Sequence, residues 1–117
     1  MSKAAYWQRG ETLDYTNNTD TTIEANIIVT LVGRIGIAGT DIKPGQKGDI
    51  HVSGVFEFSK TSSNAISFGT PVYFDGTGIT ESADNGETGD DKTSYTPAGY
   101  VAEESIAGVK TILVKIG

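Results

Sequence analysis

The sequence predicts an all-β protein, either a small β-sandwich or a partly closed β-barrel, preceded by an extended N-terminal arm. Three observations favour this class. Apolar residues recur at every second position in several short stretches, which is the spacing of side chains on one face of a strand. Turn-forming residues separate these stretches, and no stretch has the spacing of an amphipathic helix. Several short strands joined by turns are typical of sandwiches and barrels.

The chain has 117 residues, the size of one domain. We divide it into an N-terminal arm, residues 1–9, and a single β domain, residues 10–117. No apolar run approaches the roughly 20 residues that a membrane helix needs, and the first ten residues contain no apolar signal-peptide core. We therefore expect a soluble protein that is made in a cytoplasm and has no membrane partner.

Composition narrows the function classes further. The sequence has no cysteine, which excludes disulfides, thiolate nucleophiles and cysteine zinc sites. Nine Lys and Arg residues stand against 15 Asp and Glu, for a net charge of −6. Nucleic-acid binding needs cations gathered on one face, and here they are scattered along the sequence. The composition favours a protein partner and no nucleic acid.

Two long apolar patterns predict the first part of the β domain. In residues 27–38 the odd positions predict a strand with one face inward, bent at Gly33 and Gly36. Residues 50–58 repeat the pattern on the even positions, which again places one face inward. The apolar-parity residues of the two stretches are Ile27, Val29, Leu31, Ile35 and Ile37, and then Ile50, Val52, Phe56 and Phe58.

Two short segments predict reversals of the chain. The strand-like residues 72–74 run into Asp75-Gly76-Thr77-Gly78, and an Asp-Gly step tolerates the positive φ that a tight hairpin turn demands. Lys43-Pro44-Gly45 places a proline before a glycine, which is the pair that a type II turn requires. We predict a hairpin at the first segment and a simple reversal at the second.

The last predicted strand, residues 109–116, is apolar on more than one face, because Ile112, Val114 and Ile116 alternate with Leu113. Such a strand is either central in its sheet or lies in a subunit interface. Two loops are polar, residues 17–22 and the acidic residues 83–94. We expect neither to order itself strongly, and the second is long enough to be functional or mobile.

No catalytic, cofactor-binding or metal site is predicted, and we expect no enzyme. The single histidine, His51, lies at a polar position of a strand without the partners that catalysis needs, which favours an exposed structural residue. The carboxylates of residues 83–94 lack the spacing of a calcium loop. The glycines of residues 39–47 lack the spacing of a phosphate-binding loop.

The arm carries the residues that point to binding. Tyr6 and Trp7 stand close to Arg9, and these residue types anchor protein interfaces. An aromatic pair near a terminus can equally cover the end of a barrel. Both interpretations stay open at this point.

Seven motifs, each weak alone, follow one another in an order and spacing that identify a family. They are Gly10–Thr16, Val32–Ala38, Asp41–Gly48, Val52–Lys60, Phe68–Asp75, Pro97–Val101 and Ile112–Ile116. In this order they resemble the small capsid cement, or head decoration, proteins of tailed bacteriophages and prophages. The resemblance spans nearly the whole chain. It departs from the family at Thr22–Asn26, which lacks an expected glycine, and at residues 83–94, which are longer and more acidic.

The resemblance implies a structural protein that binds the outside of an assembled phage head and resists the pressure of packed DNA. The implied partner is the major capsid protein, and the implied location is the capsid surface of the virion, with the host cytoplasm during assembly. Such proteins commonly bind as oligomers at a symmetry axis, and we favour a trimer over a dimer.

Two hypotheses assign residues to these contacts. The first places the arm, with Tyr6, Trp7 and Arg9, on the capsid, where it can add a strand to an exposed edge. The second assigns Ile112, Leu113, Val114 and Ile116 to a contact between copies of this chain.

The alternative function is a host-attachment or carbohydrate-binding module. Tyr73, Tyr95 and Tyr100 would supply its stacking faces if they were exposed.

Overall fold

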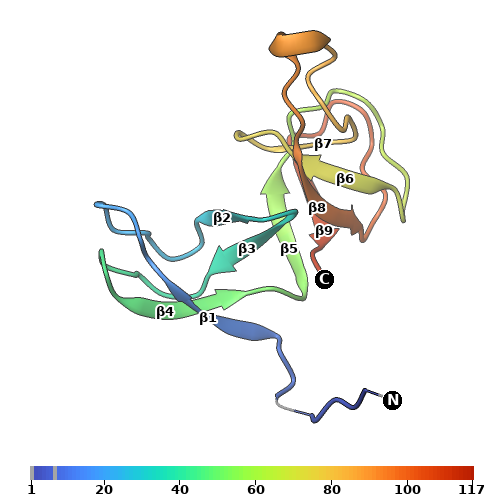
Figure 1. Cartoon of the computed structure of the whole chain (residues 1–117). Helices are drawn as coiled ribbons and strands as arrows, with labels where there is room; N and C mark the ends of the chain where they lie inside the picture. The colour runs from blue at the N-terminus through green and yellow to red at the C-terminus, as the bar shows by residue number, and fades with distance from the viewer. Residues whose placement is uncertain (1, 7) are drawn as a thin grey trace.

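Two antiparallel sheets form the body of the protein (Figure 1). The computed structural model describes residues 2–6 and 8–117, and it has no α-helix among them. The first sheet contains β1 (Thr12–Thr16), β2 (Ile28–Leu31), β3 (Arg34–Ala38) and β4 (Lys47–His51) in the order β1-β4-β3-β2. The second contains β5 (Val55–Ser59), β6 (Pro71–Phe74), β7 (Ile79–Thr80), β8 (Thr96–Val101) and β9 (Thr111–Lys115) in the order β5-β9-β8-β6-β7. Neither sheet closes into a barrel, so the all-β prediction is confirmed in its sandwich-like form.

The single strand predicted over residues 27–38 is wrong, because the chain reverses there. β2 and β3 form a hairpin in which Leu31 pairs with Arg34. The two residues between them are Val32 and Gly33, and Gly33 has a φ of +74°. Glycine adopts that conformation without steric cost, so what was interpreted as a bend is a full turn.

The continuous pattern of residues 50–58 also spans two elements. β4 ends at His51 in the first sheet, and β5 begins at Val55 in the second. Between them Gly54 has a φ of +119°, and there the chain passes from one sheet to the other. Apolar residues occupy even positions in both strands because each strand directs these residues to the interior of the molecule.

Both predicted turns are confirmed. β6 and β7 form the hairpin, in which Phe74 pairs with Ile79 and Asp75 N–H donates to the carbonyl of Gly78. At the second turn Gln46 N–H donates to the carbonyl of Lys43, and Gly45 between them has a φ of +76°. A proline followed by a glycine with positive φ is the geometry of a type II turn.

The two sheets share one plan. When β7 is set aside, each sheet has four strands, in which the first pairs with the last, the last with the third, and the third with the second. β1, β2, β3 and β4 therefore correspond to β5, β6, β8 and β9. β7 and the connection that follows it are additions to the second sheet.

The turns outside the strands repeat the same correspondence. The isolated bridge between Ile23 and Ile42 matches the bridge between Ile66 and Ser105. Each of these four residues begins a short turn whose fourth residue has positive φ. Those fourth residues are Asn26 at +73°, Gly45 at +76°, Gly69 at +88° and Gly108 at +82°.

Single hydrogen bonds match as well. Val52 N–H donates to Glu11 at the end of the first sheet, and Ile116 N–H donates to Gly54 at the corresponding place in the second. We conclude that the fold is an internal duplication. We call residues 11–52 the first half and residues 54–116 the second half.

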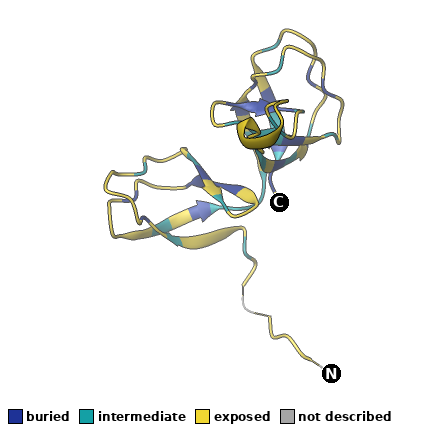
Figure 2. Cartoon of the chain, turned by 45° about the horizontal axis from the view of Figure 1, so that its top comes forward, coloured by how far each residue is buried: buried dark blue, intermediate teal, exposed yellow. Residues whose placement is uncertain are grey.

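The two halves are joined through β3. Ile35 and Ile37 enter the larger apolar cluster, whose other members lie in the second half, while Ala38 belongs to the smaller cluster of the first half (Figure 2). β3 is therefore buried on both faces. The larger cluster also contains Phe58, Ile66, Val72, Ile79, Ala98, Val101, Ile112, Val114 and Ile116, and the smaller one Val29, Ile42 and Ile50.

A buried polar residue follows the first strand of each half. Asn17 is fully buried, and its amide donates to the carbonyls of Thr21 and Ile42, both at 2.8 Å. Its oxygen accepts bonds from the backbone and the hydroxyl of Thr19. The expectation that residues 17–22 lack order is wrong, because this side chain fixes the loop from inside.

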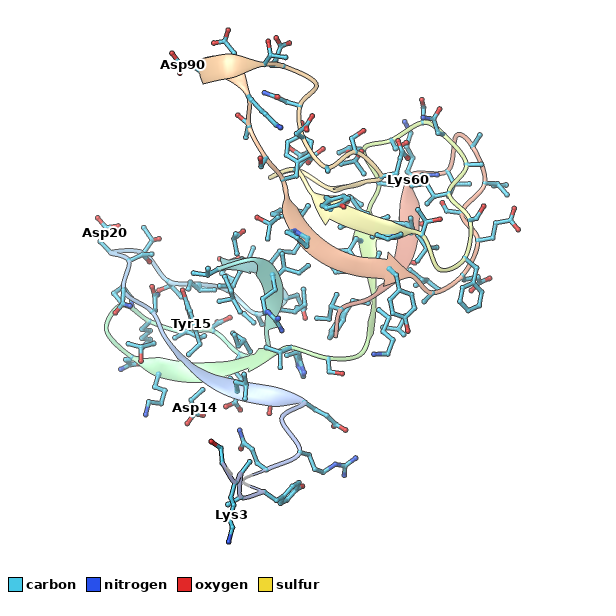
Figure 3. The ribbon with its side chains drawn as sticks, turned by 45° about the vertical axis from the view of Figure 1, so that its right-hand side comes forward. Lys3, Asp14, Tyr15, Asp20, Lys60 and Asp90 are labelled. Carbon is cyan, nitrogen blue, oxygen red and sulfur yellow. The ribbon has the colours of Figure 1, made fainter. Side chains whose placement is uncertain are left out.

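The residue of the second half that corresponds to Asn17 is Lys60, which Figure 3 labels. It is 6% exposed, and its ammonium donates to the hydroxyl of Ser105 at 2.9 Å and to the carbonyl of Ile106 at 3.1 Å. Ser105 stands where Ile42 stands in the first half. In both halves the buried side chain thus ties the end of the first strand to the turn before the last strand.

Candidate functional site

The N-terminal arm leaves the first sheet and runs away from the body (Figure 1). Its described residues belong to no strand. Tyr6 is 82% exposed, and Arg9 forms an ion pair with Glu11 at 3.0 Å, with both side chains largely in solvent. Trp7 lies outside the described residues. The interpretation of the arm as a cover over the end of a barrel fails, because no barrel is formed.

β9 is central in the second sheet, between β5 and β8. Three of the four residues predicted for a contact between copies, Ile112, Val114 and Ile116, are buried in the larger cluster of their own chain. Leu113 points the other way and is half-buried on the outer face of the sheet. Of this set, Leu113 is the residue that the structure leaves within reach of a partner.

The outer face of the second sheet carries an exposed row of side chains. Val55, Lys115, Tyr100 and Pro71 are neighbours in register across β5, β9, β8 and β6. Val55, Tyr100 and Pro71 are exposed. Lys115 donates from its ammonium to the carbonyl of Gly117. These adjacent exposed side chains make the outer face a candidate for binding another protein.

Next to this row lies a shallow hollow of about 230 Å³, which we call the acidic hollow. Leu113, Ile106 and Val109 supply apolar surface to it. Its carboxylates are Glu57 from β5 and Glu103 and Glu104 from the loop before β9, all three exposed. The sequence analysis missed this site, although Glu57 between Phe56 and Phe58 already signals an outward position on a strand.

Residues 83–95 form a second projection, which we call the acidic hairpin. Tyr95 N–H donates to Ala83, Asn85 N–H donates to Thr93, and a short 3₁₀ turn, η1 (Gly89–Asp91), closes its tip. The ammonium of Lys92 lies 3.7 Å from the carboxylate of Asp84. The hairpin is ordered by its own hydrogen bonds, contrary to expectation, and Figure 3 shows Asp90 at its far end.

Asp75 holds the turn at the base of the acidic hairpin. Its carboxylate accepts bonds from the backbone N–H groups of Thr77 and Gly78 and from the hydroxyl of Thr61. Burial raises the pKa of Asp75, but the bonds from Gly78, Thr61 and Thr77 outweigh it and hold the pKa below its ordinary value of 3.8. All these partners belong to the turn and its neighbouring loop, so the carboxylate has a structural role.

The three tyrosines of the carbohydrate-binding alternative do not share one surface. Tyr100 lies in the row on the outer face, while Tyr95 lines a different hollow beneath the acidic hairpin. Tyr73 and Tyr95 are half-buried rather than exposed.

His51 is half-buried rather than exposed, which corrects the prediction. Its ring centroid lies 5.6 Å from that of Phe56, with the planes inclined at 51°. Among the residues that the structure describes, no group of His, Asp and Glu is arranged to hold a metal ion. Nor does any helix in the described ranges have the length and apolar character needed to cross a membrane.

Comparison with known proteins gives one match. The model of a family described as phage cement protein matches residues 7–116, which include both halves and both sheets. No curated protein and no solved structure matches the chain. The match agrees with the resemblance inferred from the ordered motifs, and it covers nearly the whole sequence. The chain belongs to the phage cement protein family, whose role is structural.

Proposed function

We propose that this protein binds the outside of a phage head, through the major capsid protein, and stabilises the shell against the pressure of the packed DNA. The observation that carries the proposal is the family match over residues 7–116. The surfaces of the chain support it, since they combine an exposed arm and an exposed apolar face. A protein with this function acts through the free energy of binding alone, and it needs no reactive group.

Many copies bound to one shell strengthen one another. When linked copies bind the same shell, each further contact is intramolecular, and the overall affinity can exceed that of a single contact by about 10²–10⁴-fold. A small β body with an external arm suits this role, because the arm can reach one subunit while the body rests on another. The protein would be made in the host cytoplasm and carried on the capsid surface of the virion.

The experiment uses heads that lack the protein. Purified full-length chain is added back, its occupancy is measured by electron microscopy, and the temperature at which the heads release DNA is recorded. We expect bound copies on the outer surface and a higher release temperature. Bound copies with an unchanged release temperature would reject stabilisation, and an absence of bound copies would reject the proposal as a whole.

Within this proposal the arm contacts the capsid through Tyr6, Trp7 and Arg9. An extended segment next to the free edge strand β1 can pair with an edge of the shell protein, and aromatic side chains anchor such contacts. Deleting residues 2–9 should lower occupancy strongly, and Tyr6→Ala should lower it in part. Phe68→Ala is the matched control, since it removes an exposed aromatic side chain of the body that belongs to neither the arm nor the row on the outer face. Undiminished binding of the deletion variant would reject the role of the arm.

The proposal includes association of the chain with itself, as a trimer rather than a dimer. With Ile112, Val114 and Ile116 in the core, Leu113 is the residue of the predicted set that can take part directly. Sedimentation of the free protein and the symmetry of its density on the shell test the number of copies.

A further inference from the structure

Within residues 2–6 and 8–117, no cation forms an ion pair with the carboxylates of the acidic hollow. In the part of the chain that the structure describes, the ion pairs are Arg9 with Glu11 and Lys92 with Asp84. Glu57, Glu103 and Glu104 take part in neither. These three carboxylates line the hollow together with the apolar side chains of Leu113 and Ile106. A complementary segment would carry cations and some apolar surface.

The N-terminal arm has that chemistry. Lys3 and Arg9 are the charged residues of the arm, residues 1–9, whereas all 15 acidic residues lie in residues 10–117. In an extended segment alternate side chains point to opposite faces, so the sequence pattern assigns Lys3, Ala5, Trp7 and Arg9 to one face and Tyr6 to the other. The two cations then stand about 20 Å apart along one side of the segment.

The ion pair between Arg9 and Glu11 is too weak to keep Arg9 from binding another carboxylate. This ion pair is exposed, with 81% and 65% of the two side chains in solvent, and exposed pairs contribute little to stability. Figure 1 shows the arm leaving the molecule beside the first sheet, away from the second sheet that carries the acidic hollow. Figure 3 shows Lys3 at the outer end of the arm. The geometry favours a hollow on another copy over the hollow of the same chain.

We propose that Lys3 and Arg9 of one copy bind the acidic hollow of a second copy, with Ala5 of the arm over Leu113 and Ile106. This inference rests on the proposed function, and it reassigns Arg9, with Trp7 on the same face, from the capsid contact to the contact between copies, so that Tyr6 on the opposite face of the arm contacts the shell. One arm then holds the capsid and the neighbouring cement protein together. The contact is heterologous, because arm and hollow are different surfaces, so copies join head to tail and close into a ring when the rotation permits.

The test uses four full-length proteins in solution without heads. The arm variant is Lys3→Glu with Arg9→Glu, and the hollow variant is Glu103→Lys with Glu104→Lys. The charge control is Glu87→Lys with Asp90→Lys. It changes the net charge by the same amount as the hollow variant does, but in the acidic hairpin. Circular dichroism first establishes that each variant is folded. Sedimentation then measures self-association at low and at high salt.

We expect the wild type to associate at low salt and to dissociate at high salt, because screening weakens exposed pairs. The arm variant and the hollow variant should each associate about tenfold more weakly or worse, since two attractions become two repulsions. The charge control should associate at least as well as the wild type. The decisive result is the mixture of the arm variant with the hollow variant. Every contact between unlike variants restores opposite charges, so the two variants should associate with each other, although a closed ring of three would keep one contact between like variants.

Three results would overturn the inference. They are a wild type that stays monomeric at its highest soluble concentration, folded variants that associate as the wild type does, and a mixture that does not recover. None of these measurements involves a capsid, so their failure is distinct from failure of the proposed function, which is measured as occupancy on heads.

Discussion

At the scale of single residues, the structure assigns the largest roles to side chains that a sequence pattern does not single out. Asn17 stands in a run of Asn, Thr and Asp that is typical of a solvated loop. Its side chain instead uses both donors and its acceptor oxygen inside the protein. A buried amide with all its hydrogen bonds satisfied fixes a loop as firmly as apolar packing does.

Asn17→Ala should lower the free energy of unfolding by about 3 kcal/mol, because it leaves the carbonyls of Thr21 and Ile42 without their buried partner. Asn17→Asp should be comparably harmful, since a carboxylate cannot donate to a carbonyl. Urea denaturation measures both, with the exposed Asn18→Ala as control. An Asn17→Ala protein as stable as the control would contradict the role assigned to this side chain.

Asp75 makes stability depend on pH in acid. Its folded pKa is lower than the 3.8 of the free side chain, because the carboxylate accepts three hydrogen bonds that outweigh the effect of burial. A lowered folded pKa stabilises the protein above the unfolded value, and this contribution is lost as the pH falls through the folded pKa. Between pH 7 and pH 2, the stability difference between wild type and Asp75→Asn should therefore shrink from about pH 4 downward. A difference that stays constant over this range would contradict the shift.

At the scale of elements, alternation located the apolar segments correctly but did not show where they end. The two-residue reversal at Val32 and Gly33 leaves apolar residues at odd positions in both β2 and β3, although the register places Val29 and Ile35 on opposite faces of the sheet, each in a different apolar cluster. The passage at Gly54 likewise leaves apolar residues at even positions in both β4 and β5. A hairpin and a bent strand therefore have the same pattern, and only strand pairing distinguishes them. The turns at Lys43-Pro44-Gly45 and Asp75-Gly76 were predictable because their backbone conformations require particular residues.

The duplication supplies matched glycines in β3 and β8. Gly99 has a φ of +138°, and a Cβ there would overlap the carbonyl oxygen of Lys115. Gly99→Ala should lower the free energy of unfolding by about 3 kcal/mol or more, because the obstacle is backbone. Gly36, its counterpart, would place a Cβ 3.1 Å from the end of the Ile50 side chain and 3.3 Å from the carbonyl oxygen of His51. Both contacts are far longer than the overlap at Gly99, so Gly36→Ala should cost clearly less. Thermal unfolding measures both variants. A Gly36→Ala protein that unfolds at a lower temperature than the Gly99→Ala protein would contradict this account.

The acidic hairpin is an addition to the shared plan, since β2 and β3 are joined by a two-residue turn at the corresponding place. Replacing residues 84–94 by Asn-Gly should leave the free energy of unfolding within about 1 kcal/mol, because Ala83 and Tyr95 already pair and a shorter loop is easily closed. Denaturant unfolding and circular dichroism check this. Loss of the β spectrum would show that the hairpin supports the sheet.

At the scale of the whole molecule, two copies of one plan form a body whose larger core draws on both. Ile35 and Ile37 come from the first sheet, yet they pack in the cluster of the second half. This packing favours the prediction that residues 10–117 behave as a single domain. The two halves would then unfold together.

Ile37→Ala should lower the free energy of unfolding by about 2–4 kcal/mol, because it empties space between the two halves. It should also speed hydrogen exchange in β4 and in β9 alike. Ile27→Ala, at a position that is 48% exposed, is the control and should cost under about 1 kcal/mol. Faster exchange confined to one sheet would indicate two independent units.

The sequence by itself determined the all-β class, the two glycine-dependent turns and, through the order of its motifs, the phage cement family. These features depend on local backbone chemistry and on the order of residues, and both can be read from the sequence without knowing which strands pair. Only the tertiary structure revealed the duplication. Matching positions of the two halves have the same backbone geometry, but few of them have the same residue type, as Val29 and Val72 or Gly36 and Gly99 do. The tertiary structure also decided that Ile112, Val114 and Ile116 are core residues and that Glu57, Glu103 and Glu104 meet at one hollow, because burial and proximity between distant segments exist only once the strands have paired.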